Sequence, residues 1–237
     1  SRGLGDVYKR QPDDLEFDPQ LLETMLFART AFIDLLQNRE YSLHDRLVNV
    51  LSASAEIQYA LDEEDTEEIK AIAQELSHPE IIAERVESLK KALPEKPLEN
   101  VENMLLYLER LDFIGDILPQ QIKDASRFVE KLSAPLKAQT SGEYEKLAVY
   151  FVYRYFLKAV RDFDLLSKIK AMIVFVFAAE IINLSREQDA HARFETVKEL
   201  CKEIEYSGDN MDRIYDDSYL SDIFSDTSML ALLEWTL

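Results

Sequence analysis

Apolar residues recur at helical spacing along almost the whole chain, and this pattern restricts the fold more than any other feature of the sequence. Intervals of three and four residues place such side chains on one side of an α-helix, whereas a half-buried strand would alternate them. Successive alternating runs joined by tight hairpin dipeptides do not occur. The sequence therefore predicts an all-α fold, a bundle-like or orthogonal domain of roughly ten helices without a sheet.

Prolines and capping residues divide this pattern into segments. Ser42 begins a capping signal, and Pro79, Pro97 and Pro119 suit first helical turns, where a missing N–H is tolerated. The stretch Leu93 to Pro97 is the best linker candidate and predicts a soft domain boundary near 94–97; a further break is expected around Pro135 and 139–142. The expected helices are 19–38, 42–61, 66–76, 79–93, 98–113, 119–133, 143–160, 164–185 and 189–206, followed by short helices.

The first eleven residues, Ser1 to Gln11, resemble the translation of a sequencing adapter, so we expect Pro12 to Leu237 to be the C-terminal helical region of a longer protein. The whole chain carries a net charge of −19, and because the first eleven residues hold three basic residues and one acidic residue, the remainder carries −21. This charge repels phosphate backbones and anionic lipid, so neither nucleic acid nor a membrane is expected as a partner. Solubility alone is the simpler explanation of the acidity.

Cys201 is the only cysteine, which excludes an intrachain disulfide and a cysteine metal site, and favours a cytoplasmic location. The longest apolar run, Ala171 to Ala179, is far shorter than the ~20 residues of a membrane-spanning helix. The only glycines after Gln11 are Gly115, Gly142 and Gly208, so the chain lacks a glycine-rich phosphate loop and a dinucleotide fingerprint. No metal site is predicted.

The segments 143–160 and 164–185 are apolar nearly all round and should lie at the centre of the fold. Arg154 is the only charged residue between Leu147 and Leu157, and Glu180 is the only one between Ala171 and Leu184. Because an unpaired buried charge is costly, we expect Arg154 and Glu180 to lie close together or to line one polar cavity. A core ion pair, snorkelling side chains and a ligand-binding role are the alternatives.

Aromatic and sulfur-containing side chains follow the same spacing and are predicted to belong to the core. Cys201 falls on the stripe of Phe194, Val197 and Ile204, which favours burial over reactivity. The tyrosines of the central segment could form a stacking platform, but helical spacing among apolar neighbours favours core packing. These tyrosines are Tyr144, Tyr150, Tyr153 and Tyr155.

Two stretches resemble segments of the flagellin lysine-N-methylase family. The first is Phe27 to Leu47 (FARTAFIDLLQNREYSLHDRL), and the second is Cys201 to Asp216 (CKEIEYSGDNMDRIYD). Between them, Glu143 to Phe156 is similar to the aromatic-rich helix of the family, while 62–140 matches only in helical character and spacing.

This resemblance implies methyl transfer to lysine ε-amines of flagellin, with S-adenosylmethionine as the donor and an iron–sulfur or metal site in an upstream half. The fragment by itself should then be inactive. Tyr206 stands where the family commonly has His, and Lys202 where it has Arg, so no role of that histidine carries over. The positions that match are Glu203, Glu205, Ser207 and Asn210, although Ser207 to Asn210 also suits plain helix capping.

Three functions remain open at this point. The first is the C-terminal part of a flagellin lysine methylase that shapes a substrate groove or supports the upstream half. The second is a non-catalytic helical scaffold or protein-interaction module. The third is a ligand-binding regulator, which would require a roomy polar cavity around Arg154 and Glu180.

Overall fold

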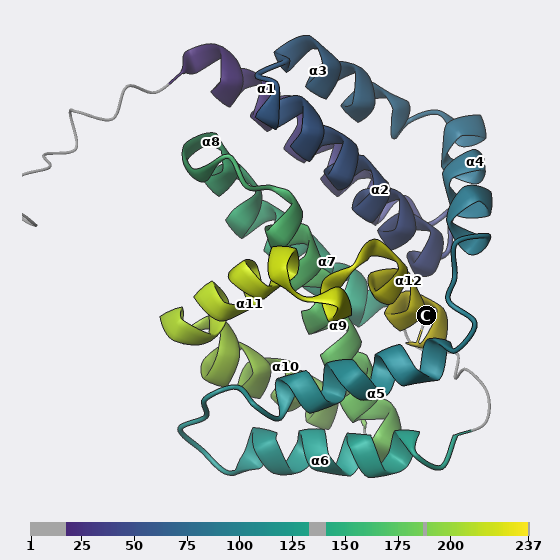
Figure 1. Ribbon diagram of the computed structural model, residues 1–237, viewed down its shortest axis with the longest axis vertical. Helices are drawn as coiled ribbons and strands as arrows, with labels where there is room; N and C mark the ends of the chain where they lie inside the picture. The colour runs from purple at the N-terminus through teal and green to yellow at the C-terminus, as the bar shows by residue number, and fades with distance from the viewer. Residues whose placement is uncertain (1–17, 133–140, 187–188, 237) are drawn as a thin grey trace, which may run out of the picture.

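The computed structural model describes residues 18–132, 141–186 and 189–236, and these residues contain helices and no strand, as predicted (Figure 1). Ser1 to Gln11 and the break expected near Pro135 lie outside the described residues. The α-helices are α1 (Pro19–Gln37), α2 (Leu43–Asp62), α3 (Thr66–Glu75), α4 (Pro79–Lys90), α5 (Pro97–Leu108), α6 (Ile117–Val129), α7 (Ser141–Tyr155), α8 (Ala159–Asp162), α9 (Leu166–Arg186), α10 (Ala190–Leu200), α11 (Gly208–Leu220) and α12 (Asp226–Thr236). Short 3₁₀ turns occur at Phe156–Lys158 and Asp222–Phe224, and a π-helical turn, η3, at Cys201–Glu205.

Capping residues set the first helices close to their predicted bounds. The Asp18 carboxylate accepts hydrogen bonds from backbone N–H groups at the start of α1, and the Ser42 hydroxyl accepts one from the N–H of Asp45 in α2. Several later helices end before their predicted bounds, and two of them show this clearly. The helix expected over 98–113 ends at Leu108, and the helix expected over 143–160 changes at Tyr155 to a 3₁₀ turn.

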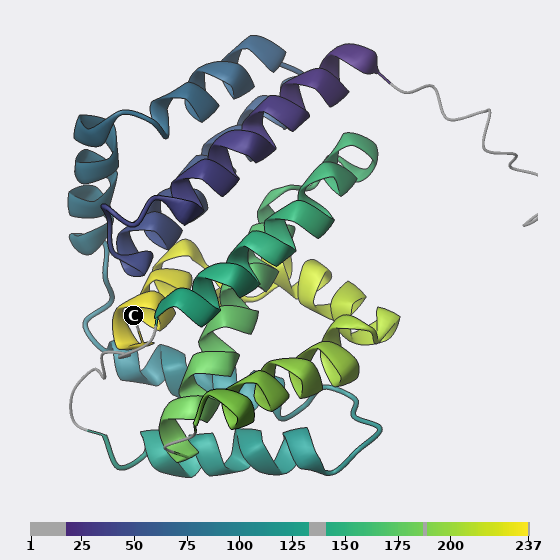
Figure 2. The same ribbon diagram turned by 180° about the vertical axis from the view of Figure 1, so that it is seen from behind.

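Helix α9 forms the centre of the molecule, which confirms the prediction from its all-round apolar sequence. Every residue from Ser167 to Asn183 is buried. The helix packs against α2, α6, α7, α10, α11 and α12, and both views show these helices gathered around it (Figures 1 and 2). Burial of apolar area on all sides is the main stabilising contribution to such a fold.

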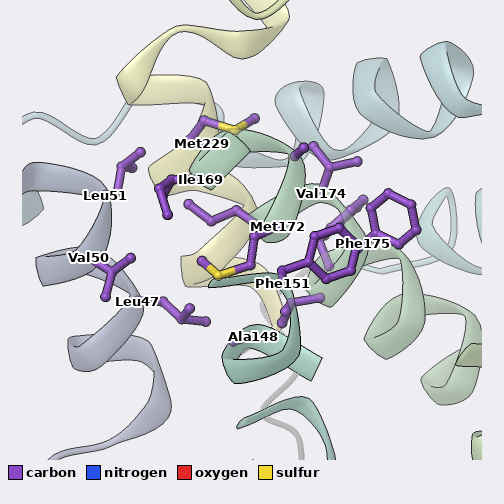
Figure 3. Packing of buried hydrophobic residues seen from close by; sticks show 14 of the residues in the cluster. Leu47, Val50, Leu51, Ala148, Phe151, Ile169, Met172, Val174, Phe175 and Met229 are labelled. Atoms are coloured by element: carbon purple, nitrogen blue, oxygen red, sulfur yellow. The ribbon is translucent and has the colours of Figure 1, made fainter. Parts of the chain in front are cut away.

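The centre of the core joins α9 to α2, α7 and α12. Figure 3 shows Ile169, Met172 and Phe175 of α9 among residues of these three helices. The rings of Phe151 in α7 and Phe175 lie 4.6 Å apart between centroids. The neighbouring helices contribute Leu47, Val50 and Leu51 from α2, Ala148 and Phe151 from α7, and Met229 from α12.

Helix α12 joins the two ends of the molecule. In Figure 1, α1, α2 and α3 lie at one end, and α5 and α6 lie at the other. α12 packs against α2, α5 and α9, so it contacts helices on both sides of the connection between Lys90 and Pro97. The segment that suggested a domain boundary therefore connects helices that share one hydrophobic core.

A buried ion pair fixes the start of α7 against α1 and α2. The Arg46 guanidinium, from α2, donates to the carboxylate of Glu145 at 2.8 Å and also to the carbonyl of Leu36, the next-to-last residue of α1. Arg39 approaches the same carboxylate from the surface at 3.0 Å. These two arginines hold the pKa of Glu145 below its usual range, opposed by desolvation. The pair sets the position of α7, which carries the candidate site.

None of the helices in the part of the chain that the structure describes is both long enough and apolar enough to cross a membrane.

Candidate functional site

A groove of about 690 Å³ lies between α7 and the segment formed by α10 and η3. Its walls combine apolar and aromatic side chains with a few charged groups near the rim. Asn183 Nδ2 donates to the hydroxyl of Tyr144 within it at 3.1 Å, and the Arg193 guanidinium pairs with the Glu143 carboxylate at 2.7 Å. The lining residues are Glu143, Tyr144, Lys146, Leu147, Tyr150, Asn183, Ala190, Arg193, Phe194, Val197, Lys198, Cys201 and Tyr206.

The stripe that predicted a core-facing side of α10 faces this groove instead. Phe194 is 63% exposed, and Val197 and Cys201 are half-buried along the wall. The buried side of α10 is formed by Thr196 and Leu200. The interpretation of the stripe as core was therefore wrong for Phe194, held in part for Val197, which is half-buried and packs against the core, and was confirmed for Ile204 in the π turn. The periodicity identified an apolar face correctly but could not show whether another helix covers it.

The π-helical turn η3 follows α10 directly and shapes the end of the groove. The backbone N–H of Tyr206 donates to the carbonyl of Cys201 at 2.9 Å, the five-residue spacing that defines such a turn. Single π turns within helices occur frequently at functional sites. Here the turn buries two carboxylates, Glu203 and Glu205, which lie two positions apart and therefore point to different sides of the helix.

Glu205 forms the centre of a polar cluster beside the groove. Its side chain is completely buried, and its Oε1 atom accepts hydrogen bonds from the hydroxyls of Tyr150 and Tyr155, each at 2.6 Å. The Arg154 Nε atom lies 3.3 Å from the same oxygen. Among the described residues, no nitrogen or oxygen donor reaches the second oxygen, Oε2. Burial first, and then the Glu205 charge, raise the pKa of both tyrosines.

The Arg154 guanidinium occupies a cage of aromatic rings. Its central carbon lies 5.8 Å from the ring centroid of Tyr150, 5.4 Å from that of Tyr155 and 5.7 Å from that of Tyr206. The Arg154 side chain is nevertheless 45% exposed, so the cage opens to solvent on one side. A cation held by aromatic faces and a carboxylate is the arrangement used to recognise ammonium groups.

Arg154 and Glu180 were expected to lie close together or to line one polar cavity; the ion pair that Arg154 forms in the structure is with Glu205. Glu180 is completely buried on α9. Burial, together with the Glu180 charge and opposed by the hydrogen bond from Asn183, raises the pKa of Tyr144 to about 12. The sequence pattern located both charges inside apolar helices, but only the fold determines which distant carboxylate reaches the arginine.

Cys201 borders the groove next to Glu205. Burial first, and then the neighbouring Glu205 carboxylate, raise the pKa of its thiol. Because the thiolate is the nucleophilic form, this environment makes the thiol a poor nucleophile at neutral pH. The geometry agrees with the expectation that Cys201 is not reactive.

Glu203 and Asn210 hold the loop that joins α5 to α6. The Glu203 Oε2 atom accepts the backbone N–H of Ile114 at 2.7 Å and that of Gly115 at 3.2 Å. The Asn210 side chain accepts the N–H of Asp112 at 3.0 Å and donates to the carbonyl of the same residue at 2.6 Å. These hydrogen bonds satisfy backbone groups in the loop after α5, including the N–H of Asp112, which the predicted helix over 98–113 would have paired internally.

Ser207 acts as the N-cap of α11, because its hydroxyl accepts the backbone N–H of Asn210 at 3.3 Å. This confirms the capping interpretation for Ser207, while Gly208 is the first residue of α11 and not the end of the preceding helix. Glu203, Ser207 and Asn210 therefore hold backbone groups of the loop and of α11, whereas Glu205 belongs to the polar cluster beside the groove.

Sequence reasoning missed the cage itself. Tyr144 and Tyr155 are buried, as predicted, but Tyr153 is 66% exposed and Tyr150 lies half-buried at the groove. Tyr206 was considered only as a departure from the family pattern, and it provides the outer ring of the cage. The number of tyrosines in α7 was the available signal, but it does not indicate that the third ring of the cage comes from Tyr206.

A family model for the C-terminal domain of the FliB lysine N-methylase matches residues 29–232. Comparison with the curated proteins gave no significant match, and neither did comparison with the solved structures. The matched range includes α7, α10, η3 and every residue of the cage.

Proposed function

This chain belongs to the family of FliB lysine N-methylase C-terminal domains, and from that premise we propose that it is the C-terminal domain of a flagellin lysine N-methyltransferase. The match over residues 29–232 is the observation that carries the proposal. The protein would transfer methyl groups to lysine ε-amines of flagellin in the cytoplasm of a flagellated bacterium. Two of the three stretches that resemble this family, Glu143 to Phe156 and Cys201 to Asp216, border the groove.

Within that protein, the groove between α7 and α10 suits contact with the substrate. It combines exposed apolar surface, notably Phe194, with lining tyrosines, and one of these, Tyr150, donates a hydrogen bond to the buried carboxylate of Glu205. Concave, largely apolar sites with a few oriented polar groups are typical of ligand recognition. We assign the domain a part in holding flagellin, and not the transfer of the methyl group.

The described residues do not fit the metal or cofactor groups that the resemblance implies. An iron–sulfur cluster needs several thiolates, and the chain has only Cys201. No group of three or more histidine, cysteine, aspartate or glutamate side chains among the described residues could hold a metal ion. We therefore propose that an iron–sulfur or metal site of the full-length protein would be built from residues other than the described ones.

A non-catalytic interaction module is the alternative function. The aromatic surface of the groove, with Phe194 and Tyr206 each more than half exposed, would serve such a module equally well. Activity distinguishes the two functions, because only the methylase requires methyl transfer when the remainder of the protein is present.

The test is to recover the full gene and to assay purified flagellin for methyl-lysine by mass spectrometry with S-adenosylmethionine as donor. We expect methylation by the full-length protein and none by this chain or by the upstream half alone. Failure of the full-length protein to methylate flagellin, or the absence of cysteine ligands upstream of Pro12, would reject the methylase and leave the interaction module.

A further inference from the structure

We propose that the aromatic cage formed by Tyr150, Tyr155, Tyr206 and Glu205 is a recognition site for a lysine side chain of the protein substrate, which the Arg154 guanidinium occupies in the free domain. This inference rests on the proposed function and deepens it, since it assigns the chemistry that the groove recognises. The incoming ammonium would displace Arg154 and take over its contacts with the rings and the carboxylate.

The chemistry of the cage suits a cation with a long aliphatic stem. Three aromatic faces within 6 Å of the guanidinium carbon stabilise a positive charge, and the buried carboxylate of Glu205 adds a charged hydrogen-bond acceptor. The groove beside the cage supplies apolar wall from Leu147 and Val197, against which a lysine stem can pack.

The free oxygen of Glu205 specifies the kind of cation. Oε1 receives the two tyrosine hydroxyls and Arg154, but no nitrogen or oxygen donor among the described residues reaches Oε2. The thiol of Cys201 also lies within hydrogen-bonding reach of this carboxylate, but a thiol is a weak donor. A buried carboxylate oxygen without a strong donor is unfavourable, so a ligand that brings an N–H group would relieve that cost. An unmethylated or partly methylated ammonium carries such a group, whereas a trimethylammonium does not.

Arg154 is suited to leave the cage because few hydrogen bonds hold its guanidinium there. Its side chain is 45% exposed. Among the described residues, the guanidinium makes one hydrogen bond, from Nε to the hydroxyl of Tyr155 at 3.0 Å, besides the 3.3 Å contact with Glu205. A planar guanidinium that met its carboxylate through two parallel hydrogen bonds would be held more firmly. Rotation of Arg154 into solvent exposes the carboxylate without moving the backbone of α7.

The site would bind a lysine and would not activate it. A neighbouring carboxylate favours the charged ammonium and raises its pKa, whereas methyl transfer needs the neutral amine. The lysine in the cage is therefore a docking residue of the substrate, and it differs from the lysine that accepts the methyl group.

The probe is a blocked lysine, Nα-acetyl-lysine N-methylamide, titrated into the chain with isotope-labelled tyrosines and followed by NMR. We expect the ring signals of Tyr150, Tyr155 and Tyr206 to shift. The norleucine counterpart, which lacks the ammonium, should bind at least about tenfold more weakly if the charge-assisted hydrogen bond to Glu205 is formed. The trimethyl-lysine counterpart should also bind more weakly than lysine.

Arg154→Gln should bind the blocked lysine about 3- to 30-fold more tightly, because the competing cation and its cation–π contacts are removed. Arg127→Gln, a change at an exposed arginine of α6, is the matched control and should leave the affinity unchanged. Glu205→Gln should weaken binding at least about tenfold. Because that variant could fail to fold, Tyr206→Leu, at a 66% exposed ring, provides a second test and should weaken binding about two- to fivefold.

Equal binding of lysine and norleucine, an affinity unchanged by Arg154→Gln, or tighter binding of trimethyl-lysine would each overturn the proposal. The methylation assay separates this inference from the proposed function. If the full-length protein methylates flagellin but its cage does not bind lysine, only the lysine-docking role of the cage is rejected. If the cage binds lysine but the full-length protein does not methylate flagellin, only the proposed methylase function is rejected.

Discussion

At the scale of single residues, Glu203 shows how one carboxylate can hold a loop. The backbone N–H of Ile114 first, and then Lys202, hold the pKa of Glu203 below its usual range against the effect of desolvation. The carboxylate is therefore charged in the folded chain at a pH where an unfolded glutamate is already protonated. Its contribution to stability is complete above the ordinary glutamate pKa of about 4.3 and is lost as the pH falls through the lower folded value.

Glu203→Gln should lower the free energy of unfolding by roughly 1–2 kcal/mol at pH 7, because a neutral amide is a weaker acceptor for the two backbone N–H groups. Urea unfolding at pH 7 and at pH 3 measures the effect. The difference between the variant and the unmodified chain should shrink as the pH falls from 7 to 3, because protonation of Glu203 removes the charge that the variant lacks at every pH. A difference that stays constant with pH would show that the charge of Glu203 does not contribute.

Gly115 has the tightest surroundings of the glycines in the part of the chain that the structure describes. A Cβ atom at Gly115 would lie 3.0 Å from the Glu203 Oε1 atom, closer than ordinary contact. Gly115→Ala should therefore displace the carboxylate and destabilise the chain by roughly 1–3 kcal/mol. Gly208→Ala is the matched control, because a Cβ there meets nothing within 4 Å and the residue opens a helix.

Thermal unfolding of both alanine variants provides the measurement. Gly208→Ala should be neutral or slightly stabilising, since alanine favours helix over glycine by up to about 1 kcal/mol. If Gly115→Ala were as harmless as the control, the close approach of Glu203 to the loop would not matter for stability.

At the scale of elements, the segment from η3 to α11 connects the groove with the rest of the molecule. η3 directs Glu205 toward α7 and Glu203 toward the loop before α6. The Ser207 cap then begins α11, whose Asn210 holds the same loop. The cage and the α5–α6 loop therefore depend on one short stretch of chain.

Ser207→Ala should cost about 1 kcal/mol, the usual loss when a capping hydroxyl is removed. Hydrogen exchange should speed up most at the start of α11 and at Asp112, because Asn210 is displaced with the cap. Ser42→Ala removes the corresponding cap of α2 and serves as the control, with faster exchange confined to the start of that helix. An unchanged exchange rate at Asp112 in Ser207→Ala would show that the loop is held independently of the cap.

At the scale of the whole molecule, one hydrophobic core extends through both halves of the chain. α9 is buried along its length, and α12 contacts α2 and α5 on either side of the connection between Lys90 and Pro97. A core that is shared in this way favours cooperative unfolding, because neither half keeps its buried surface without the other.

Phe175→Ala should lower the free energy of unfolding by about 3–5 kcal/mol through loss of buried area and creation of a cavity at the centre of α9. We expect one urea transition, with the same midpoint by circular dichroism and by tyrosine fluorescence. In Phe175→Ala both midpoints should fall by the same amount. Two separate transitions, with only one affected by Phe175→Ala, would instead support a domain boundary near 94–97.

Local signals in the sequence were enough to predict the helical class, the central place of α9 and several helix starts. The reason is that apolar spacing, proline and capping residues act within a few positions along the chain. Pro79 and Pro97 stand first in their helices, and Ser42 and Ser207 cap theirs. Such local signals need no knowledge of the rest of the fold.

The end of α5 and the partners of the buried charges depend instead on how distant helices pack, and the sequence pattern does not contain that information. Asn210 takes the backbone N–H of Asp112 that a longer α5 would have paired, and Glu205 reaches Arg154 across 51 positions of sequence. The stripe that begins at Phe194 was apolar as predicted, yet Phe194 itself is 63% exposed, whereas Ile204 at its other end is buried. Periodicity reveals the direction of a side chain on its own helix, whereas the neighbour that it meets depends on how distant helices pack.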